Sequence, residues 1–350
     1  MTKEITLSVD AMGGDAAPAI VMNGIAEARL RYPNTRYLLF GRSDEIQPYL
    51  DENTLLQDCC DIRHCDDVVT GEQKVSQAIR QGRNSSMWNA INAVKTGEAD
   101  GIVSAGNTGA LMAMAKLSMR TLPGIDRPAI CSLFPNQVGE TVMLDLGANA
   151  QCDVRNLVEF AVMGACFTRA ITGLEIPRVG LLNIGSEDLK GTDVLREAAA
   201  LLRESDLDMD FIGFVEGDDI TLGTVDVVVT DGFTGNVSLK TAEGTAKLYT
   251  QFLKSAFKSS MMAKLGYLLI KPVLSQVMAR TDPRKYNGAL FVGLNGVAVK
   301  SHGGTDALGF ANAIGVAVDM VDRDLNSSIG EQLTHLNFDV VEPEQVATTL

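Results

Sequence analysis

The stretch VDVVVTDGFTGNVSLKTAEG, residues 225–244, joins a short apolar run to a glycine-containing polar loop and then to a helix-like segment. Val225 to Val229 are typical of a buried strand, residues 230–236 of a loop, and the chain from Val237 onward of a helix. This unit predicts a strand-to-helix turn of an α/β sheet.

Two other segments repeat the same unit. ITLSVDAMGGDAAPAIVMNGI (5–25) predicts a strand, a loop over 10–15 and a helix that Pro18 opens near its first turn. GIVSAGNTGALMAMAKL (101–117) predicts a strand, a loop over 104–109 and a helix from Ala110. Helix N-termini present unpaired backbone N–H groups, which suit phosphate or a developing oxyanion. The three loops together predict a composite anion site at the carboxyl ends of parallel strands.

Strand-like and helix-like segments alternate along most of the chain. The strand-like segments include 37–41, 101–105, 141–147, 178–185, 210–217 and 225–230. This alternation predicts an α/β fold with a mostly parallel, doubly wound sheet covered by helices on both faces. We expect a single α/β catalytic domain over residues 1–330, in one or two lobes, and a C-terminal tail over 331–350. Polar loops after two of these strands add Asn149, Glu187, Asp188 and Lys190 to the candidate ring.

Composition excludes several classes of protein. The chain has 350 residues, of which 46% are hydrophobic and 21% charged, as in ordinary soluble proteins. A net charge of −14 argues against nucleic-acid binding. We expect neither a metal nor a cofactor, because three scattered histidines and six cysteines form no ligand pattern. The absence of a signal-peptide pattern and of an apolar run approaching ~20 residues predicts a cytoplasmic protein.

Residues 240–285 form a local exception to the acidic composition. This segment holds nine Lys or Arg residues against Glu243 and Asp282, and its apolar residues recur at helical spacing. Gly266 and Lys271-Pro272 interrupt the apolar face, so we predict two projecting basic amphipathic helices or a kinked pair, ending near Asp282-Pro283. The segment is either a dimer interface or core helix with a solvated lysine face, or a helix that binds a membrane surface.

Six motifs taken together resemble one family. They are VDAMGGD, SAGNTGALM, GIDRPA, LLNIGSEDLKG, VVVTDGFTGN and SHGGTD, spread over about residues 4–318. In combination they resemble the phosphate acyltransferases of bacterial phospholipid synthesis. The resemblance implies transfer of a long-chain acyl group from acyl carrier protein to inorganic phosphate, giving an acyl phosphate that a membrane enzyme uses to acylate glycerol 3-phosphate. It also implies a homodimer with a fold similar to isopropylmalate dehydrogenases and phosphate acetyltransferases.

The same resemblance implies catalytic importance for Lys190 of SEDLKG and Asn236 of DGFTGN. Many family members have His directly after DAMGGD, where this chain has Ala16, so no general base is expected there. Direct attack of phosphate on a thioester needs little proton transfer, because phosphate has a pKa of about 6 to 7 and a thiolate leaves readily. Cys131 and Cys152 have no neighbouring His, and no G-x-S-x-G elbow exists, so no acyl-enzyme is expected.

The remaining candidate residues fall into three roles. For phosphate or substrate binding we predict Gly13, Gly14, Ser104, Gly106, Asn107, Thr108, Asn149 and Gly235. For orienting Lys190 or capping loops we predict Asp10, Asp15 and Asp231, since unpaired carboxylates would repel phosphate. His302, followed by two glycines, is a further candidate for the pocket.

Three other functions compete with this interpretation. A phosphate acetyltransferase using acyl-CoA shares the chemistry, whereas a nicotinamide-dependent dehydrogenase is disfavoured by the absence of G-x-G-x-x-G. A membrane-associated scaffold without catalysis would leave the polar loops without a role. Expected partners are acyl carrier protein, inorganic phosphate, a second copy of the chain, and an anionic membrane surface or a membrane glycerol 3-phosphate acyltransferase. Peripheral association with the inner face of the membrane follows from these partners.

Overall fold

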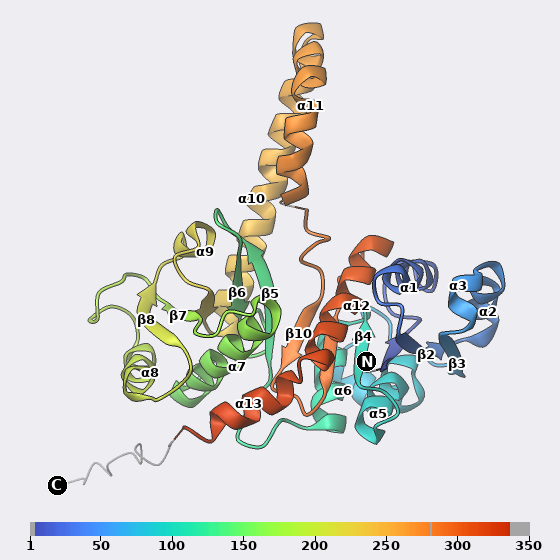
Figure 1. Cartoon of the computed structure of the whole chain (residues 1–350), viewed down its shortest axis with the longest axis horizontal. Helices are drawn as coiled ribbons and strands as arrows, with labels where there is room; N and C mark the ends of the chain where they lie inside the picture. Colours follow the sequence, from blue (N-terminus) through green and yellow to red (C-terminus); the bar gives the residue numbers. More distant parts are fainter. Residues whose placement is uncertain (1–3, 281, 337–350) are drawn as a thin grey trace.

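Eleven strands form one sheet in the computed structural model, which describes residues 4–280 and 282–336 (Figure 1). Their order across the sheet is β3-β2-β1-β4-β11-β10-β5-β6-β9-β7-β8. The strands are β1 (Ile5–Asp10), β2 (Thr35–Gly41), β3 (Cys60–His64), β4 (Gly101–Ser104), β5 (Ala129–Pro135), β6 (Glu140–Leu144), β7 (Arg178–Leu182), β8 (Asp210–Val215), β9 (Val227–Val229), β10 (Ala289–Val292) and β11 (Val297–Lys300). Neighbours pair in parallel except at β11–β10, β10–β5 and β5–β6. The predicted mostly parallel sheet is confirmed.

The antiparallel pairings divide the sheet into two parallel blocks. The first is β3-β2-β1-β4-β11 and the second is β6-β9-β7-β8. Strand direction reverses between them, because β5 runs with the first block and β6 runs against it. The sequence indicated strands at the positions of β1, β2, β4 and β6 to β9, but it did not indicate β3, β5, β10 and β11.

Helices cover both faces of the sheet, as predicted. They are α1 (Ala19–Arg31), α2 (Ser43–Glu52), α3 (Thr54–Gln57), α4 (Val75–Gln81), α5 (Ser86–Thr96), α6 (Thr108–Met119), α7 (Val154–Thr172), α8 (Asp193–Glu204), α9 (Asp219–Leu222), α10 (Gly232–Lys258), α11 (Met261–Arg280), α12 (Ala307–Asp322) and α13 (Leu325–Leu333), with a short 3-10 turn η1 (Gly82–Asn84). Pro18 is the residue that precedes the first turn of α1, as its fixed φ predicts.

Alternation along the strands separates the core into layers. In β9, Val227 and Val229 join a large cluster that includes side chains of α1, α7 and α12, whereas Val228 joins a smaller cluster with Leu239 of α10. In the first block, Ile102 packs with residues of α5 and α6. Ile102 and Val228 therefore lie on the same face of the sheet, opposite the large cluster. Successive side chains of a strand point to opposite faces, so each block is covered on both sides.

Helices α10 and α11 project from the body as an antiparallel pair (Figure 1). The break lies at Ser259-Ser260, and the ring centroids of Phe257 and Tyr267 are 5.1 Å apart across it. The predicted pair and its end near Asp282 are confirmed. The expected interruption at Gly266 and Lys271-Pro272 is wrong, because both positions lie inside the continuous helix α11.

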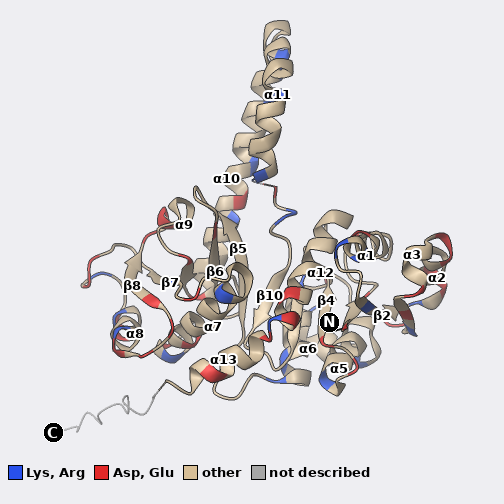
Figure 2. Cartoon of the chain, viewed as in Figure 1, with Lys and Arg blue, Asp and Glu red and all other residues tan. Residues whose placement is uncertain are grey.

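No residue of α11 is buried, so the core-helix alternative for this segment is wrong. Large apolar side chains such as Leu269, 77% exposed, lie beside basic residues, and Figure 2 shows no acidic residue on α11. Within residues 4–280 and 282–336, no helix has the length and apolarity that crossing a membrane requires. Of the predicted tail, residues 331–333 belong to α13, and 337–350 lie outside the described residues, as does Thr281 of the basic segment.

Candidate functional site

Polar loops follow three neighbouring parallel strands of the first block: 10–15 after β1, 104–107 after β4 and 301–306 after β11. We call these loops the Asp10 group. Asp10 is buried and accepts hydrogen bonds from the hydroxyls of Ser86, at 2.6 Å, and Ser104, at 2.8 Å. Burial raises the pKa of Asp10, and these hydrogen bonds oppose the rise. Asp10 therefore fixes the loop after β4 from the end of β1.

Glycines allow the loops of the Asp10 group to lie against each other. A Cβ at Gly13 would be 2.6 Å from an oxygen of Asp10 and 2.7 Å from the backbone N of Gly106. Gly14 has φ +111°, which side chains rarely adopt, and the N–H of Asp15 donates to the carbonyl of Gly303 at 3.0 Å. The DAMGGD, SAGNTG and SHGGTD motifs thus form one contiguous arrangement.

The other predicted residues of the Asp10 group differ in what they can reach. Asn107 caps α6 by accepting from the N–H of Ala110, and its amide N donates to the carbonyls of Gly71 and Gln73, so this side chain supports the loop. Thr108 begins α6 and is exposed. His302 is also exposed, and its Nδ1 accepts from the N–H of Gly304 at 3.1 Å.

A second arrangement lies at the carboxyl ends of β6, β9 and β7, which are also neighbouring parallel strands. Its loops are 145–153, 230–231 with the first turn of α10, and 183–192, and we call them the Asp145 group. Asp145 is fully buried. Its carboxylate accepts from the backbone N–H groups of Ile130, Gly147, Ala148 and Asn149 and from the amide of Asn149. Asp145 therefore holds the loop after β6 in one shape.

The first turn of α10 packs directly on that loop. A Cβ at Gly235 would be only 1.9 Å from the carbonyl oxygen of Asp145, and one at Gly232 would be 2.6 Å from that of Asn149. The N–H of Gly232 donates to the same Asn149 oxygen at 2.7 Å. Only glycine permits this approach. Asp231 caps the helix by accepting from the N–H of Thr234 at 2.7 Å, so the capping role predicted for Asp231 is the one observed.

Asn236 and Lys190, the two residues expected to be catalytic, both belong to the Asp145 group. Asn236 is exposed in the first turns of α10 and lies beside Gly147, where a Cβ would be 3.7 Å from its Oδ1. Lys190 is exposed in the loop after β7, and its ammonium forms no ion pair with any residue in 4–280 or 282–336. Asn149, also predicted here, donates its amide to the carbonyl of Pro128 at 2.8 Å and so stabilises the loop.

The three glycine-containing loops, predicted to form a composite site at the carboxyl ends of parallel strands, do not all follow strands of one parallel block. Two of them belong to the Asp10 group, whereas the third follows β9, beyond the reversal of strand direction at β5 and β6. Within the described part of the chain, no hydrogen bond or ion pair joins the two groups. Asp10 and Asp15 accordingly do not orient Lys190, because both lie in the Asp10 group.

Cysteines near the Asp145 group are unsuited to nucleophilic attack. Burial, with help from the charges of Asp145 and Asp231, raises the pKa of Cys152 to about 12. Cys131 is fully buried, and burial raises its pKa further still. Both thiols are therefore protonated near neutral pH, whereas the nucleophile would be the thiolate.

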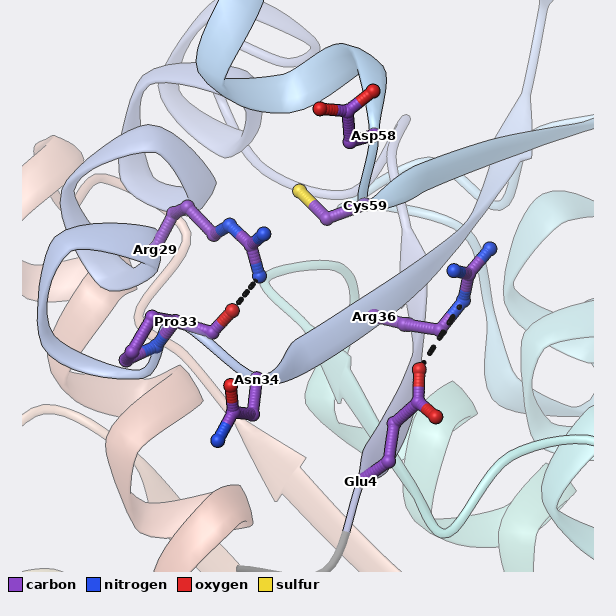
Figure 3. Close-up of a pocket in the computed structure, with 7 residues that line it drawn as sticks. All are labelled: Glu4, Arg29, Pro33, Asn34, Arg36, Asp58 and Cys59. Atoms are coloured by element: carbon purple, nitrogen blue, oxygen red, sulfur yellow. Dashed lines mark hydrogen bonds and ion pairs between the residues drawn. The ribbon is translucent and has the colours of Figure 1, made fainter.

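A separate pocket opens at the amino-terminal ends of β1 and β2 (Figure 3), away from both groups of loops. Its lining consists of Glu4, Arg29, Pro33, Asn34, Arg36, Asp58 and Cys59. Arg29 donates to the carbonyl of Pro33, and Arg36 lies 4.0 Å from Glu4. The guanidinium groups of Arg29 and Arg36 in this pocket therefore lie next to oxygen atoms of the protein itself. Among the described residues, no cluster of three or more His, Cys, Asp or Glu side chains could hold a metal ion.

Sequence inspection missed three residues of these groups. Asp145, Ser86 and Lys300 are all buried. Ser86 and Lys300 bond to segments distant in the chain, whereas Asp145 bonds to residues 147–149 and to Ile130 of the neighbouring strand β5. Lys300 precedes the SHGGTD motif directly, so a lysine at the end of an apolar VAVK run was the available signal. For Ser86, only the packing of α5 on β1 shows that its hydroxyl donates to Asp10.

Comparison with known proteins places the chain among enzymes of one kind. A family model described as "Fatty acid synthesis protein" matches residues 5–328. A protein named phosphate acyltransferase from Paramagnetospirillum magneticum is 58% identical over 347 residues, covering 99% of each chain. Another of that name from Rhodospirillum rubrum is 60% identical over 333 residues, covering 95% of each. A phosphotransacetylase structure from Streptococcus pyogenes has a TM-score of 0.60 at 18% identity, covering 91% of this chain and 94% of its own, which is a likeness of fold alone.

Proposed function

Because this chain belongs to the phosphate acyltransferase family, and is therefore an acyl-transferring enzyme, we propose that it transfers a long-chain acyl group from acyl carrier protein to inorganic phosphate. The acyl phosphate would then supply the acylation of glycerol 3-phosphate in phospholipid synthesis. The observation that supports this most is the placement of Lys190 and Asn236 at the carboxyl ends of the neighbouring strands β7 and β9. Lys190 contributes an exposed cation that forms no ion pair with the residues that the structure describes, and Asn236 contributes an exposed amide.

The reaction is a direct displacement. A phosphate oxygen attacks the thioester carbonyl carbon, the carbonyl oxygen becomes an oxyanion, and collapse of this intermediate expels the carrier thiolate. Phosphate is already largely ionised at neutral pH and a thiolate is a good leaving group, so no general base is needed. Ala16, exposed in the loop after β1, is consistent with a site that lacks a histidine there.

Charge stabilisation then provides most of the catalysis. Lys190 supplies a point charge on a long stem, and Asn236 supplies an uncharged N–H donor beside the N-terminus of α10. A donor aimed at a developing oxyanion contributes roughly 3 kcal/mol. The high pKa of Cys152 opposes a covalent acyl-enzyme, which leaves direct attack by phosphate as the supported route.

The helical pair α10–α11 supports a docking role. It exposes apolar side chains next to lysines, as a helix that binds an anionic membrane surface does. We therefore include peripheral association with the inner face of the membrane in the proposal. A second copy of the chain, forming a homodimer, would cover part of the same apolar surface. Acyl carrier protein, if acidic, is an alternative ligand for the lysines.

The test is acyl-phosphate formation from a long-chain acyl carrier protein and inorganic phosphate, for the native chain, Lys190→Ala and Lys95→Ala. Lys95 is an exposed lysine in the last turn of α5, outside both groups of loops and the helical pair, and is the control. We expect Lys190→Ala to lose about 10²-fold in kcat and Lys95→Ala to match the native chain. No product from the folded native chain would refute the proposal, and equal rates with acetyl-CoA would transfer it to coenzyme A thioesters.

A further inference from the structure

Two adjacent cysteines lie where the turn after α3 enters β3. Cys59 is the residue before β3, and Cys60 is the first residue of that strand. Both thiols are free, and their sulfur atoms are 3.9 Å apart, a distance at which one thiol donates a hydrogen bond to the other. The proposed acyl transfer uses neither of them. The fold thus places a pair of thiols side by side outside both groups of loops.

Cys59 also lines the pocket at the amino-terminal ends of β1 and β2. Figure 3 shows its sulfur directed toward the guanidinium of Arg29. The pocket has a volume of about 490 Å³, many times that of a water molecule. Cys59 itself is only 2% exposed, so a bulky reagent cannot surround its sulfur. A reagent close to water in size, such as hydrogen peroxide, fits this limited access.

The surroundings of Cys59 favour its thiolate. The hydrogen bond with Cys60 lowers the pKa of Cys59 to about 7, and the charges of Arg29 and Arg36 act in the same direction, against burial. The same hydrogen bond, together with burial, raises the pKa of Cys60. Cys60 therefore keeps its proton and donates it to the sulfur of Cys59, which is about half ionised at pH 7.

Other charged groups near the thiol pair are exposed, paired or neutral. Asp58 precedes Cys59 and opposes its ionisation, but Asp58 is exposed. Glu4 lies 4.0 Å from Arg36. Burial raises the pKa of Tyr37 on β2, so its phenol is neutral near pH 7. In α2, which packs on β3, the two acidic residues of the last turn are exposed. The arginines of the pocket are therefore the cations that stabilise the thiolate.

The other four cysteines differ from this pair within the same chain. Burial raises the pKa of each of their thiols; they are Cys65, Cys131, Cys152 and Cys166. These thiols are protonated near neutral pH, whereas a thiolate is the form that peroxide oxidises. Oxidation should accordingly concentrate at Cys59.

We propose that Cys59 and Cys60 form a site of reversible oxidation by hydrogen peroxide. The thiolate of Cys59 attacks one peroxide oxygen, the O–O bond breaks, hydroxide leaves, and Cys59 becomes a sulfenic acid. The sulfur of Cys60 then displaces the hydroxyl group of that sulfenic acid, which forms a disulfide and releases water. The two thiols lose two electrons in all, and peroxide gains them.

Formation of this disulfide requires only a small movement of the two sulfurs. They must approach from 3.9 Å to the ~2.0 Å of a disulfide bond. Neighbouring Cα atoms are ~3.8 Å apart, which is less than disulfides usually span, so an added thiol should reduce the bond readily. The inference does not rest on the proposed function, because β3 is the outer strand of the first block and the Asp145 group belongs to the second.

The test exposes the native chain to hydrogen peroxide at pH 7 and follows every cysteine by mass spectrometry of its peptide. The peptide that holds Cys59 and Cys60 should lose two hydrogens at least about 10-fold faster than any other cysteine is oxidised, because an ordinary thiol is only a few per cent ionised at this pH. Dithiothreitol should restore both thiols. In the chain unfolded by urea, Cys59 should react at a rate similar to the other cysteines, because the pocket is lost.

Three variants separate the roles of the two thiols. Cys60→Ser keeps a hydrogen-bond donor beside Cys59 but removes the second thiol, so a sulfenic acid should accumulate at Cys59 and be trapped by dimedone. Cys59→Ser should leave Cys60 reduced. Cys65→Ser, at a buried cysteine just beyond β3, is the matched control and should form the disulfide as the native chain does.

Two results with the folded native chain would overturn the proposal. One is oxidation of Cys59 no faster than that of the other four cysteines. The other is a sulfenic acid that persists at Cys59 without a disulfide to Cys60. Both are measured on the native chain, so they decide the matter even if a variant fails to fold. Neither measurement involves acyl transfer, so failure of the proposed function would leave this result unaffected.

Discussion

Gly235→Ala tests whether the contact between α10 and the loop after β6 sets the catalytic geometry. In the native chain, the Cα of Gly235 lies against the carbonyl oxygen of Asp145, and an added Cβ would be 1.9 Å from it. Real Cβ atoms stay at least 3.0 Å from such an atom, so helix and loop must separate by about 1.1 Å. Asn236 is the next residue, and it would move with the helix.

Two magnitudes follow from this displacement. A misplacement of about 1 Å at a catalytic group costs on the order of 10²-fold in rate, so we expect a loss of that size in kcat. Overpacking a close contact destabilises by roughly 1–3 kcal/mol, whereas Ala improves helix propensity by up to about 1 kcal/mol, so the free energy of unfolding should fall modestly.

Gly244→Ala is the matched control, because Gly244 lies on the same helix and a Cβ there would meet nothing within 4 Å. Acyl-phosphate formation and denaturant unfolding should be measured for both variants. We expect Gly244→Ala to keep native activity and to be as stable as the native chain or slightly more so. Native activity in a folded Gly235→Ala would refute the argument that this contact positions Asn236.

Three other substitutions test different parts of the structure. Asp145→Asn replaces one acceptor oxygen with an NH₂ donor that faces backbone N–H groups, so the free energy of unfolding in denaturant should fall by about 2–4 kcal/mol. A fall below about 0.5 kcal/mol would contradict that bonding pattern. The pKa of Lys300 is lower in the folded state than in the unfolded state, so the unfolded state binds more protons between pH 8 and 10.5. The free energy of unfolding is therefore greatest above pH 10.5, where Lys300 is neutral in both states, and this stability is lost as pH falls to about 8. The stability of the native chain relative to Lys300→Met should therefore rise by about 3 kcal/mol between pH 7 and 10.5, and a constant difference would contradict the shift. The third test reverses charges in the helical pair by combining Lys254→Glu, Lys258→Glu and Lys264→Glu. The fraction of protein that floats with anionic vesicles should fall severalfold, because each lysine contributes about 1 kcal/mol to membrane binding. Unchanged flotation would exclude electrostatic docking.

The sequence by itself determined the class of fold and the local form of each loop. Apolar runs such as Val225 to Val229, followed by a polar loop and a helical pattern, indicate strand, turn and helix because these signals depend on neighbouring residues. The capping role of Asp231 and the projecting basic helices were predictable for the same reason. The six quoted motifs also indicated the family, which the comparisons confirm.

Only the tertiary structure decided which loops belong together. Strand order and direction depend on pairings between distant segments, and the antiparallel pairings β11–β10, β10–β5 and β5–β6 reverse the strand direction between β4 and β9. That reversal separates the Asp10 group from the Asp145 group, although their loops look alike in sequence. The same applies to buried polar residues. Lys300 resembles an ordinary charged residue in the sequence, because its burial and its bond to the carbonyl of Ala105 arise only when strands distant in the chain come together. Asp145 bonds mainly to residues 147–149 of its own loop, but its burial and its bond to Ile130 arise from the pairing of β5 with β6.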